Sequence, residues 1–382
     1  MMYCLPSYWI MVLRLNKQDN IRINPKILEW ARESSGYSQL DVANSCNVEE
    51  FQYNRWESEG TEVSLETLRS LSHLFKVQMA TFFYPTVPPR PVRPIDRRNS
   101  SNGPLSPKTV ISFRETFKLR NFLLNLKGQE FYIKKYDWVS EIDKSLINRL
   151  DDRILTNLVR DKIGYSVCDQ LKDKDPNSSY KNWRKLIEQN LGINTFQYSL
   201  PEDDVQGYCY SGDFPYCIVT NSKYAHSSRI FTLLHEIGHI IKRQSGLCIP
   251  DQVTDNQELE LECNSFAARV LLPDEWVIKS SDSIEIYKYA RKFNVSSEVY
   301  LRRLKSLEMI SDEEFFSLLK QIRAAVKPVS AFGKPQTSVQ KSISSRGQSL
   351  FNNVIEALGK RSISYSYASE LLGLKSCDLL NI

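Results

Sequence analysis

The feature that most constrains this chain is the stretch Phe231–Lys242, FTLLHEIGHIIK, which contains His235, Glu236 and His239 in the order H-E-x-x-H. Residues four apart share one face of a helix, so the two imidazoles are placed to hold one ion. Zinc accepts nitrogen ligands in tetrahedral geometry, and a catalytic zinc keeps one position for water. Glu236 lies about 100° round the helix from His235, where its carboxylate is placed to act as a general base. The stretch predicts a buried helix with a hydrolytic metal site, although a core helix with two chance histidines would have the same pattern.

A third ligand is expected downstream, in the segment Gln257–Pro273. Apolar residues recur there at helical spacing and define a buried stripe: Leu259, Cys263, Phe266, Ala267 and Val270. Glu260 shares its flank of this helix with Asn264, so we expect Glu260 to turn inward and Asn264 to orient a ligand. Glu262, on the other flank, is the alternative ligand, and otherwise a solvated glutamate at the helix edge.

These two motifs resemble the ImmA/IrrE family of metallopeptidases, in particular its long members with an N-terminal helix-turn-helix of the XRE type. The matching residues are Thr232–His239, TLLHEIGH, and Glu260–Pro273, with Cys263 where that family often has alanine. The resemblance implies a gluzincin-like site with one Zn²⁺ per chain, held by His235, His239 and Glu260, and with Glu236 as the catalytic base. It also implies an endopeptidase that cleaves a specific regulatory protein, a repressor or antitoxin, in phage, toxin–antitoxin or stress control.

Residues 21–84 predict a bundle of four short helices, the third running from Glu49 to Glu57. Asn24 followed by Pro25 is a typical helix start, and Ser64 is a plausible cap for the fourth helix. The order of these helices resembles the helix-turn-helix of phage-repressor-type regulators. Its usual W-E-x-G ending is matched by Trp56, Glu57 and Gly60 with one residue inserted.

In that fold the third helix enters the major groove of double-stranded DNA. The candidates for contact with DNA or with a partner protein are Gln52, Tyr53, Asn54 and Arg55. Residues 21–84 carry six Lys/Arg against nine Asp/Glu, a net charge of −3, which is the wrong sign for strong phosphate contact. A module for homodimerisation or for docking a partner protein is therefore the alternative to DNA binding.

The fold class we expect is α+β and mainly helical, with a zincin-like domain that contains a small antiparallel sheet. Strands are predicted at 193–198, 206–210 and 216–220, before the zinc helix. The expected segments are an N-terminal extension (1–20), the helix-turn-helix domain (21–84), a Pro/Arg-rich linker (85–108), the zincin-like metallopeptidase domain (109–324), a loose linker (325–347) and a C-terminal helical unit (348–382). That terminal unit is either a partner-binding piece or a cap on the preceding core.

Three other side chains near the motif are weaker candidates. Tyr208 or Tyr210 could polarise a substrate carbonyl, although a packed tyrosine in the sheet is the simpler interpretation. His226 precedes the zinc helix and could act as an electrophile, but no motif supports it.

Cysteine usage excludes two classes of small domain. The eight cysteines are scattered and include no C-x-x-C pair, which argues against a disulfide framework and a cysteine zinc knuckle and favours the cytoplasm. The apolar N-terminus is too short to span a bilayer and lacks the features of a signal peptide. Met11 is an alternative start to Met1, and no other stretch is apolar enough to lie in a membrane.

The leading hypothesis is thus a zinc-dependent endopeptidase coupled to a helix-turn-helix module. The alternative is a DNA- or partner-binding transcriptional regulator whose zincin domain is a sensor or a structural module. Another divalent ion could replace zinc, because affinity alone does not select metals in cells.

Overall fold

The computed structural model describes residues 20–89, 105–150, 152–243, 247–248, 257–325, 335–380 and 382. They form two compact units, one of residues 20–89 with 105–117, the other running from 118 to the C-terminus. The predicted N-terminal extension, except Asn20, and most of the predicted linker at 85–108 lie outside the described residues. Within the described ranges, no helix has both the length and the apolar character that a membrane crossing requires.

The first unit is a helical bundle with a two-stranded antiparallel sheet. Its elements are β1 (Asn20–Ile23), α2 (Pro25–Glu33), α3 (Gln39–Cys46), α4 (Glu50–Ser58), β2 (Thr61–Ser64), α5 (Leu65–Phe75), η1 (Met79–Phe83) and the start of α6 (Pro107–Lys127). Side-chain caps begin three of these helices: Asn24 for α2, Ser38 in a capping box with Asp41 for α3, and Ser64 for α5. The four predicted helices are present, whereas β1 and β2 were not predicted, because four residues are too few to show an alternating pattern.

The second unit is built round a four-stranded sheet with the strand order β3-β5-β4-β6. Before the metal motif come the rest of α6, then α7 (Gln129–Tyr136), α8 (Lys144–Ile147), α9 (Arg153–Ile163), α10 (Val167–Gln170), α11 (Pro176–Leu186), the π-helical η3 (Ile187–Leu191), β3 (Asn194–Tyr198), β4 (Gly207–Tyr210) and β5 (Cys217–Asn221). The motif lies on α12 (His226–Ile241), followed by β6 (Leu247–Cys248), α13 (Gln257–Leu271), η4 (Asp274–Trp276), α14 (Ser283–Lys292), α15 (Ser297–Ser306) and α16 (Asp312–Ala325). The chain ends in α17 (Ser338–Arg346), α18 (Gln348–Gly359), α19 (Tyr365–Leu372) and α20 (Ser376–Leu379).

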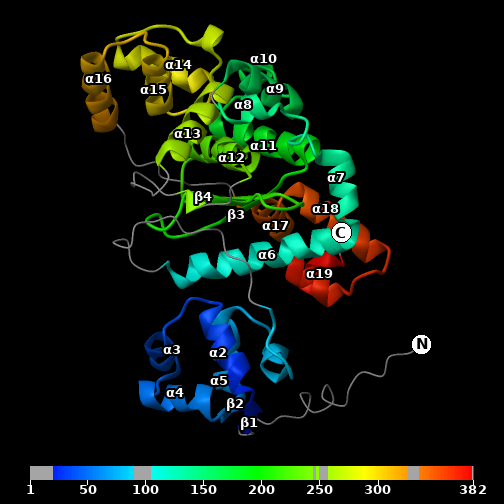
Figure 1. The fold of residues 1–382 in the computed structure, drawn as a ribbon. Helices are drawn as coiled ribbons and strands as arrows, with labels where there is room; N and C mark the ends of the chain where they lie inside the picture. The colour runs from blue at the N-terminus through cyan, green and yellow to red at the C-terminus, as the bar shows by residue number, and fades with distance from the viewer. Residues whose placement is uncertain are drawn as a thin grey trace. The chain divides into compact units, whose positions relative to one another are not determined.

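The sheet is mixed, so the prediction of an antiparallel sheet was wrong in part. Strand β5 pairs antiparallel with β4, as the hairpin pattern predicts, but parallel with β3, where Asn194 lies opposite Cys217. The reason is that β4 does not return beside β3, and β5 fills the place between them. Helices cover both faces of the sheet: α11, α12 and α13 lie on one side and α17 on the other (Figure 1).

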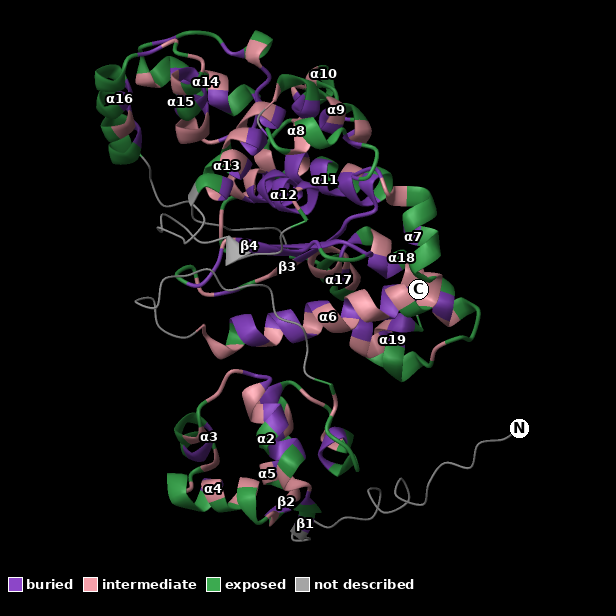
Figure 2. Ribbon diagram, viewed as in Figure 1, coloured by how far each residue is buried: buried purple, intermediate pink, exposed green. Residues whose placement is uncertain are grey.

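Burial is continuous along the centre of this unit. Every residue of β4 and β5 is buried, which is expected of strands covered on both faces, and Figure 2 shows the same burial along most of α12. Two glycines permit close packing on α12. A Cβ added at Gly207 would lie 2.5 Å from Thr232 Cγ2, and one at Gly238 would lie 3.0 Å from Cys263 Sγ. These contacts hold β4 and α13 close to the helix that carries the motif.

The C-terminal helices pack against β3 and η3 and belong to the second compact unit. Buried Arg184 donates to the Thr195 carbonyl and to the Ser344 carbonyl, and the backbone N–H of Ser349 donates to Glu188 at 3.0 Å. Residues 338–346, which we predicted to be loose, form α17, because Thr337 and Gln340 make a capping box at its start.

Candidate metal centre

Helix α12 carries His235, Glu236 and His239 in the interior of the second unit. The helix is long enough for four turns and is apolar nearly all round, which explains why all three polar side chains are buried. Buried polar groups need a partner, so the arrangement around these side chains is informative.

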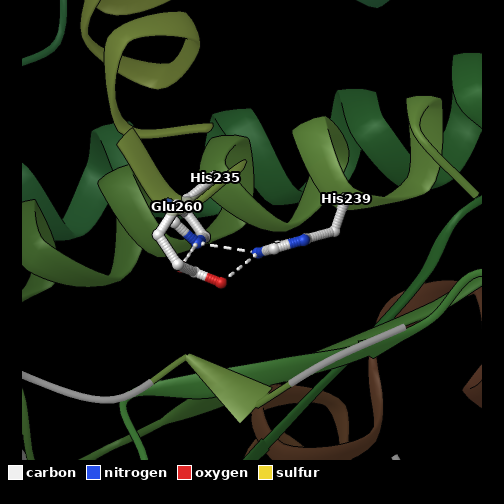
Figure 3. A group of neighbouring side chains, drawn as sticks. All are labelled: His235, His239 and Glu260. Carbon is white, nitrogen blue, oxygen red and sulfur yellow. Dashed lines mark hydrogen bonds and ion pairs between the residues drawn. The ribbon is translucent and has the colours of Figure 1, made fainter. Parts of the chain in front are cut away.

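The three residues predicted as metal ligands lie together. His235 Nε2 and His239 Nε2 are 3.0 Å apart, and the Glu260 carboxylate reaches them from α13 at 3.1 Å and 3.4 Å respectively. Figure 3 shows the three side chains pointing toward one another from the two helices. With metal–ligand bonds near 2.0–2.1 Å, neighbouring ligand atoms of tetrahedral zinc lie about 3.3 Å apart. The spacing and the His₂Glu donor set therefore fit one zinc ion with a fourth position left for water.

Asn264 lies beside this cluster, one helical turn after Glu260. Its Oδ1 is 3.0 Å from His235 Nδ1, so the ring N–H at Nδ1 donates to the amide oxygen. This contact directs Nε2 of His235 toward the cluster, where it is the nitrogen that would bind a metal.

Glu236, the residue after His235, is completely buried. Neither of its carboxylate oxygens has a nitrogen or oxygen hydrogen-bond partner among the described residues. Burial raises the pKa of Glu236, while the two histidines and the thiol of Cys209 on β4 oppose that rise. A buried carboxylate beside the cluster, with no nitrogen or oxygen donor bound to it, is placed to accept a proton from a bound water.

Glu260 behaves differently, although it too is largely buried. Burial acts to raise its pKa, but hydrogen bonds and charge interactions with His235 and His239 outweigh burial and hold the pKa far below its usual value. The carboxylate form that a metal ligand requires is therefore the one that the site favours.

Glu262, the alternative ligand, lies outside the cluster. Its carboxylate forms an ion pair of 2.7 Å with Lys242, the residue that follows α12. This pair joins the end of α12 to α13 on the flank opposite Glu260. This ion pair was not predicted from the sequence, because Lys242 and Glu262 belong to two different helical segments.

The weaker candidates near the motif are packed against other aromatic side chains and lie outside the ligand cluster. Tyr208 and Tyr210 are buried and pack edge to face, with ring centroids 6.1 Å apart. His226 packs its ring against Tyr180 at the start of α12 and is absent from the ligand cluster. The thiol of Cys209, by contrast, forms a hydrogen bond with Glu236. The sequence could not predict this contact, because every residue of β4 is buried and no alternating pattern shows which side chains face α12.

The candidate contact residues of the first unit differ in exposure. Gln52 and Arg55 are exposed on α4 and Asn54 is half-buried, whereas Tyr53 is completely buried. Tyr53 is therefore not available to DNA or a partner, and that prediction was wrong. The cause is packing: the ring of Tyr53 is buried beside that of Trp56, with the ring centroids 5.8 Å apart. Arg55 forms an exposed ion pair of 2.7 Å with Glu59.

Comparison with known protein families gives a match within each unit. Residues 188–305 match the model of the IrrE N-terminal-like domain of peptidase family M78, and residues 28–82 match a helix-turn-helix model. The first match includes the whole ligand cluster, and the second includes α4. Neither the curated proteins nor the solved structures compared with the sequence gave a match. The chain thus combines an N-terminal helix-turn-helix domain with a peptidase domain of the ImmA/IrrE type.

Proposed function

We propose that this protein is a zinc-dependent endopeptidase that cleaves a specific regulatory protein. The observation that carries the proposal is the convergence of His235, His239 and Glu260 at ligand spacing, with the buried carboxylate of Glu236 beside them. Two helices that served only the core would gain nothing from bringing four ionisable side chains together in the interior, because each side chain loses solvation.

Each residue has a distinct role in this proposal. His235, His239 and Glu260 hold the ion, and zinc in such a site polarises a carbonyl and lowers the pKa of water. Glu236 accepts the proton of the attacking water and passes it to the leaving amine, which keeps the proton balance of peptide hydrolysis.

The substrate we propose is a repressor, antitoxin or similar regulator, because the peptidase domain shares its chain with a helix-turn-helix domain. We also propose that the protein acts in a reducing compartment, the cytoplasm. Six of the cysteines are free thiols, as expected where disulfides do not persist: Cys46, Cys168, Cys209, Cys217, Cys263 and Cys377.

The test compares newly formed protein N-termini in cells that express the wild type or Glu236→Gln. Glutamine keeps the size of the side chain but cannot take a proton, so the variant retains its metal and loses cleavage. We expect one or a few N-termini that occur only with the wild type. Equal sets of N-termini from the two proteins would refute the assigned base and the peptidase activity together.

A second candidate function is binding of double-stranded DNA by the first unit, supported by the match to the helix-turn-helix model and by the exposure of Gln52 and Arg55 on α4. Glu59 neutralises Arg55 in the free protein, so Glu59→Gln strengthens binding of the full chain to DNA and Arg55→Gln weakens it. A gel-shift series at increasing salt measures both effects. Binding that ignores both substitutions would favour the alternative, a partner-docking or homodimerising module.

A further inference from the structure

A cavity lies in the second unit between α17, the segment Leu372–Asp378 and the end of β3. Its volume is about 550 Å³, within the range of small-ligand sites. It is separate from the metal centre, since none of the residues that line it belongs to the cluster on α12 and α13.

The sequence of α17 places a row of polar side chains along one wall of the cavity. Five positions of α17 line the cavity and follow the spacing of one helix face: Ser338, Lys341, Ser342, Ser345 and Arg346. In a helix that packs on a core, such a stripe is normally apolar. Here it carries two cations and three hydroxyls. Ser342 and Ser345 donate to backbone carbonyls, so the cations are the groups that would receive an anion.

Positive charge is concentrated in this cavity. Lys341, Arg346 and Lys375 line it, against Asp378 as the single acid. Neither Lys341 nor Lys375 forms an ion pair with an acid among the described residues, so the two ammonium groups remain available. Arg346 is held in place by donating to the hydroxyl of Tyr198 at 3.0 Å.

The cavity walls are fixed to the sheet. Gln197, next to Tyr198 on β3, donates to Ser344 of α17 at 2.7 Å and accepts from Arg229 of α12 at 2.8 Å. Ser342 donates to the carbonyl of Leu372 at 2.7 Å, which joins α17 to α19. A site whose cations rest on such joined elements is preorganised for its ligand.

We propose that this cavity binds a small phosphorylated ligand that also carries hydroxyl groups, such as a sugar phosphate. Lys341, Lys375 and Arg346 receive the phosphate through charge-assisted hydrogen bonds. Asp378 accepts hydrogen bonds from hydroxyls of the ligand. A site for a bare anion would have no use for an acid, so the hydroxyls give Asp378 its role.

The phosphate part is tested by calorimetric titration of inorganic phosphate into the full-length protein, with potassium chloride at matched ionic strength as the reference. The double variant Lys341→Gln/Lys375→Gln should bind phosphate about tenfold or more weakly than the wild type. The control is Lys144→Gln/Lys320→Gln, which removes the same charge from exposed helix positions outside the cavity. Because all three proteins keep the same metal centre, phosphate that binds there contributes equally to each.

The outcomes separate the proposal from general charge effects. Saturable phosphate binding that only the cavity variant loses supports the site. Equal losses in the two double variants, or no binding beyond that of chloride, overturn it. For the hydroxyl part, ribose 5-phosphate should bind more tightly than inorganic phosphate, and Asp378→Asn should remove that gain. Equal affinity for the two probes in the wild type refutes the role of Asp378.

Discussion

The Nδ1 of His235 lies 3.0 Å from the Oδ1 of Asn264, so a residue of α13 orients a histidine of α12. The same helix supplies Glu260, one turn earlier, to the Nε2 of that histidine. Helix α13 therefore contacts both sides of one imidazole ring. This arrangement orients the imidazole ring before any metal binds and lowers the cost of ordering the ligand.

Asn264→Ala should weaken metal binding while leaving the ligands themselves intact. Loss of the acceptor at Nδ1 frees the ring and its tautomer, and such changes typically cost about 10–100-fold in metal affinity. Competition with a fluorescent zinc chelator measures the affinity directly, without any need for a substrate. Asn264→Asp is the matched control, because aspartate keeps an acceptor at the same place and should retain most of the affinity. An alanine variant with wild-type affinity would show that the contact does not position His235.

The choice between Glu260 and Glu262 gives the second prediction. Purified wild-type protein should contain about one zinc per chain, Glu260→Ala should lose it, and Glu262→Ala should keep it, because Glu262 is already engaged with Lys242 at 2.7 Å. Elemental analysis after dialysis measures the metal content. The two alanine variants lie two residues apart on one helix, so each is a control for the other. Metal loss in Glu262→Ala alone would reverse the assignment.

Much of this site follows from helical spacing in the sequence. Helical spacing brings His235 and His239 to one face of α12, and the flank shared with Asn264 favours Glu260 over Glu262. These relationships are local, because each depends on the geometry of a single helix. The structure adds the contact between the two helices, which spacing within either helix cannot predict.

Other features depend on tertiary packing and were beyond sequence reasoning. All residues of β5 are buried, so its sequence has no alternating pattern. Without such a pattern, the sequence did not indicate that β5 lies in the middle of the sheet, beside β3 as well as β4. Tyr53 has the spacing of an exposed residue on a recognition helix, yet the bundle of the first unit buries it. The start of α17 was overlooked among serines and lysines, although Thr337 and Gln340 have the spacing of a capping box.

Gly207 gives a prediction about the support of the metal helix. A Cβ at this position would lie 2.5 Å from Thr232 Cγ2 and 2.7 Å from the Val219 carbonyl oxygen, so Gly207→Ala must displace β4 from α12 or from β5. Overpacking of this kind costs about 1–3 kcal/mol of unfolding free energy. Gly212→Ala is the control, since a Cβ there meets nothing within 4 Å. Chemical denaturation should separate the two variants, and equal stabilities would show that the contact relaxes freely.

His226 gives the prediction for pH. Burial, helped by the nearby charge of Arg229, lowers the pKa of His226 to about 4 from its usual 6.5, and its place at the positive end of α12 acts in the same direction. The folded protein therefore keeps this ring neutral where the unfolded chain protonates it. Its contribution to stability is complete above about pH 6.5 and is lost as the pH falls toward 4.

His226→Phe should flatten this dependence, because phenylalanine retains the ring contact with Tyr180 but has no proton to gain. Unfolding free energies of the metal-free proteins, measured between neutral pH and about pH 4.5, test the prediction. Removing the metal excludes the protonation of bound ligands as a cause. The wild type should lose more stability than the variant over this interval, and parallel curves would mean that His226 does not resist protonation in the folded state.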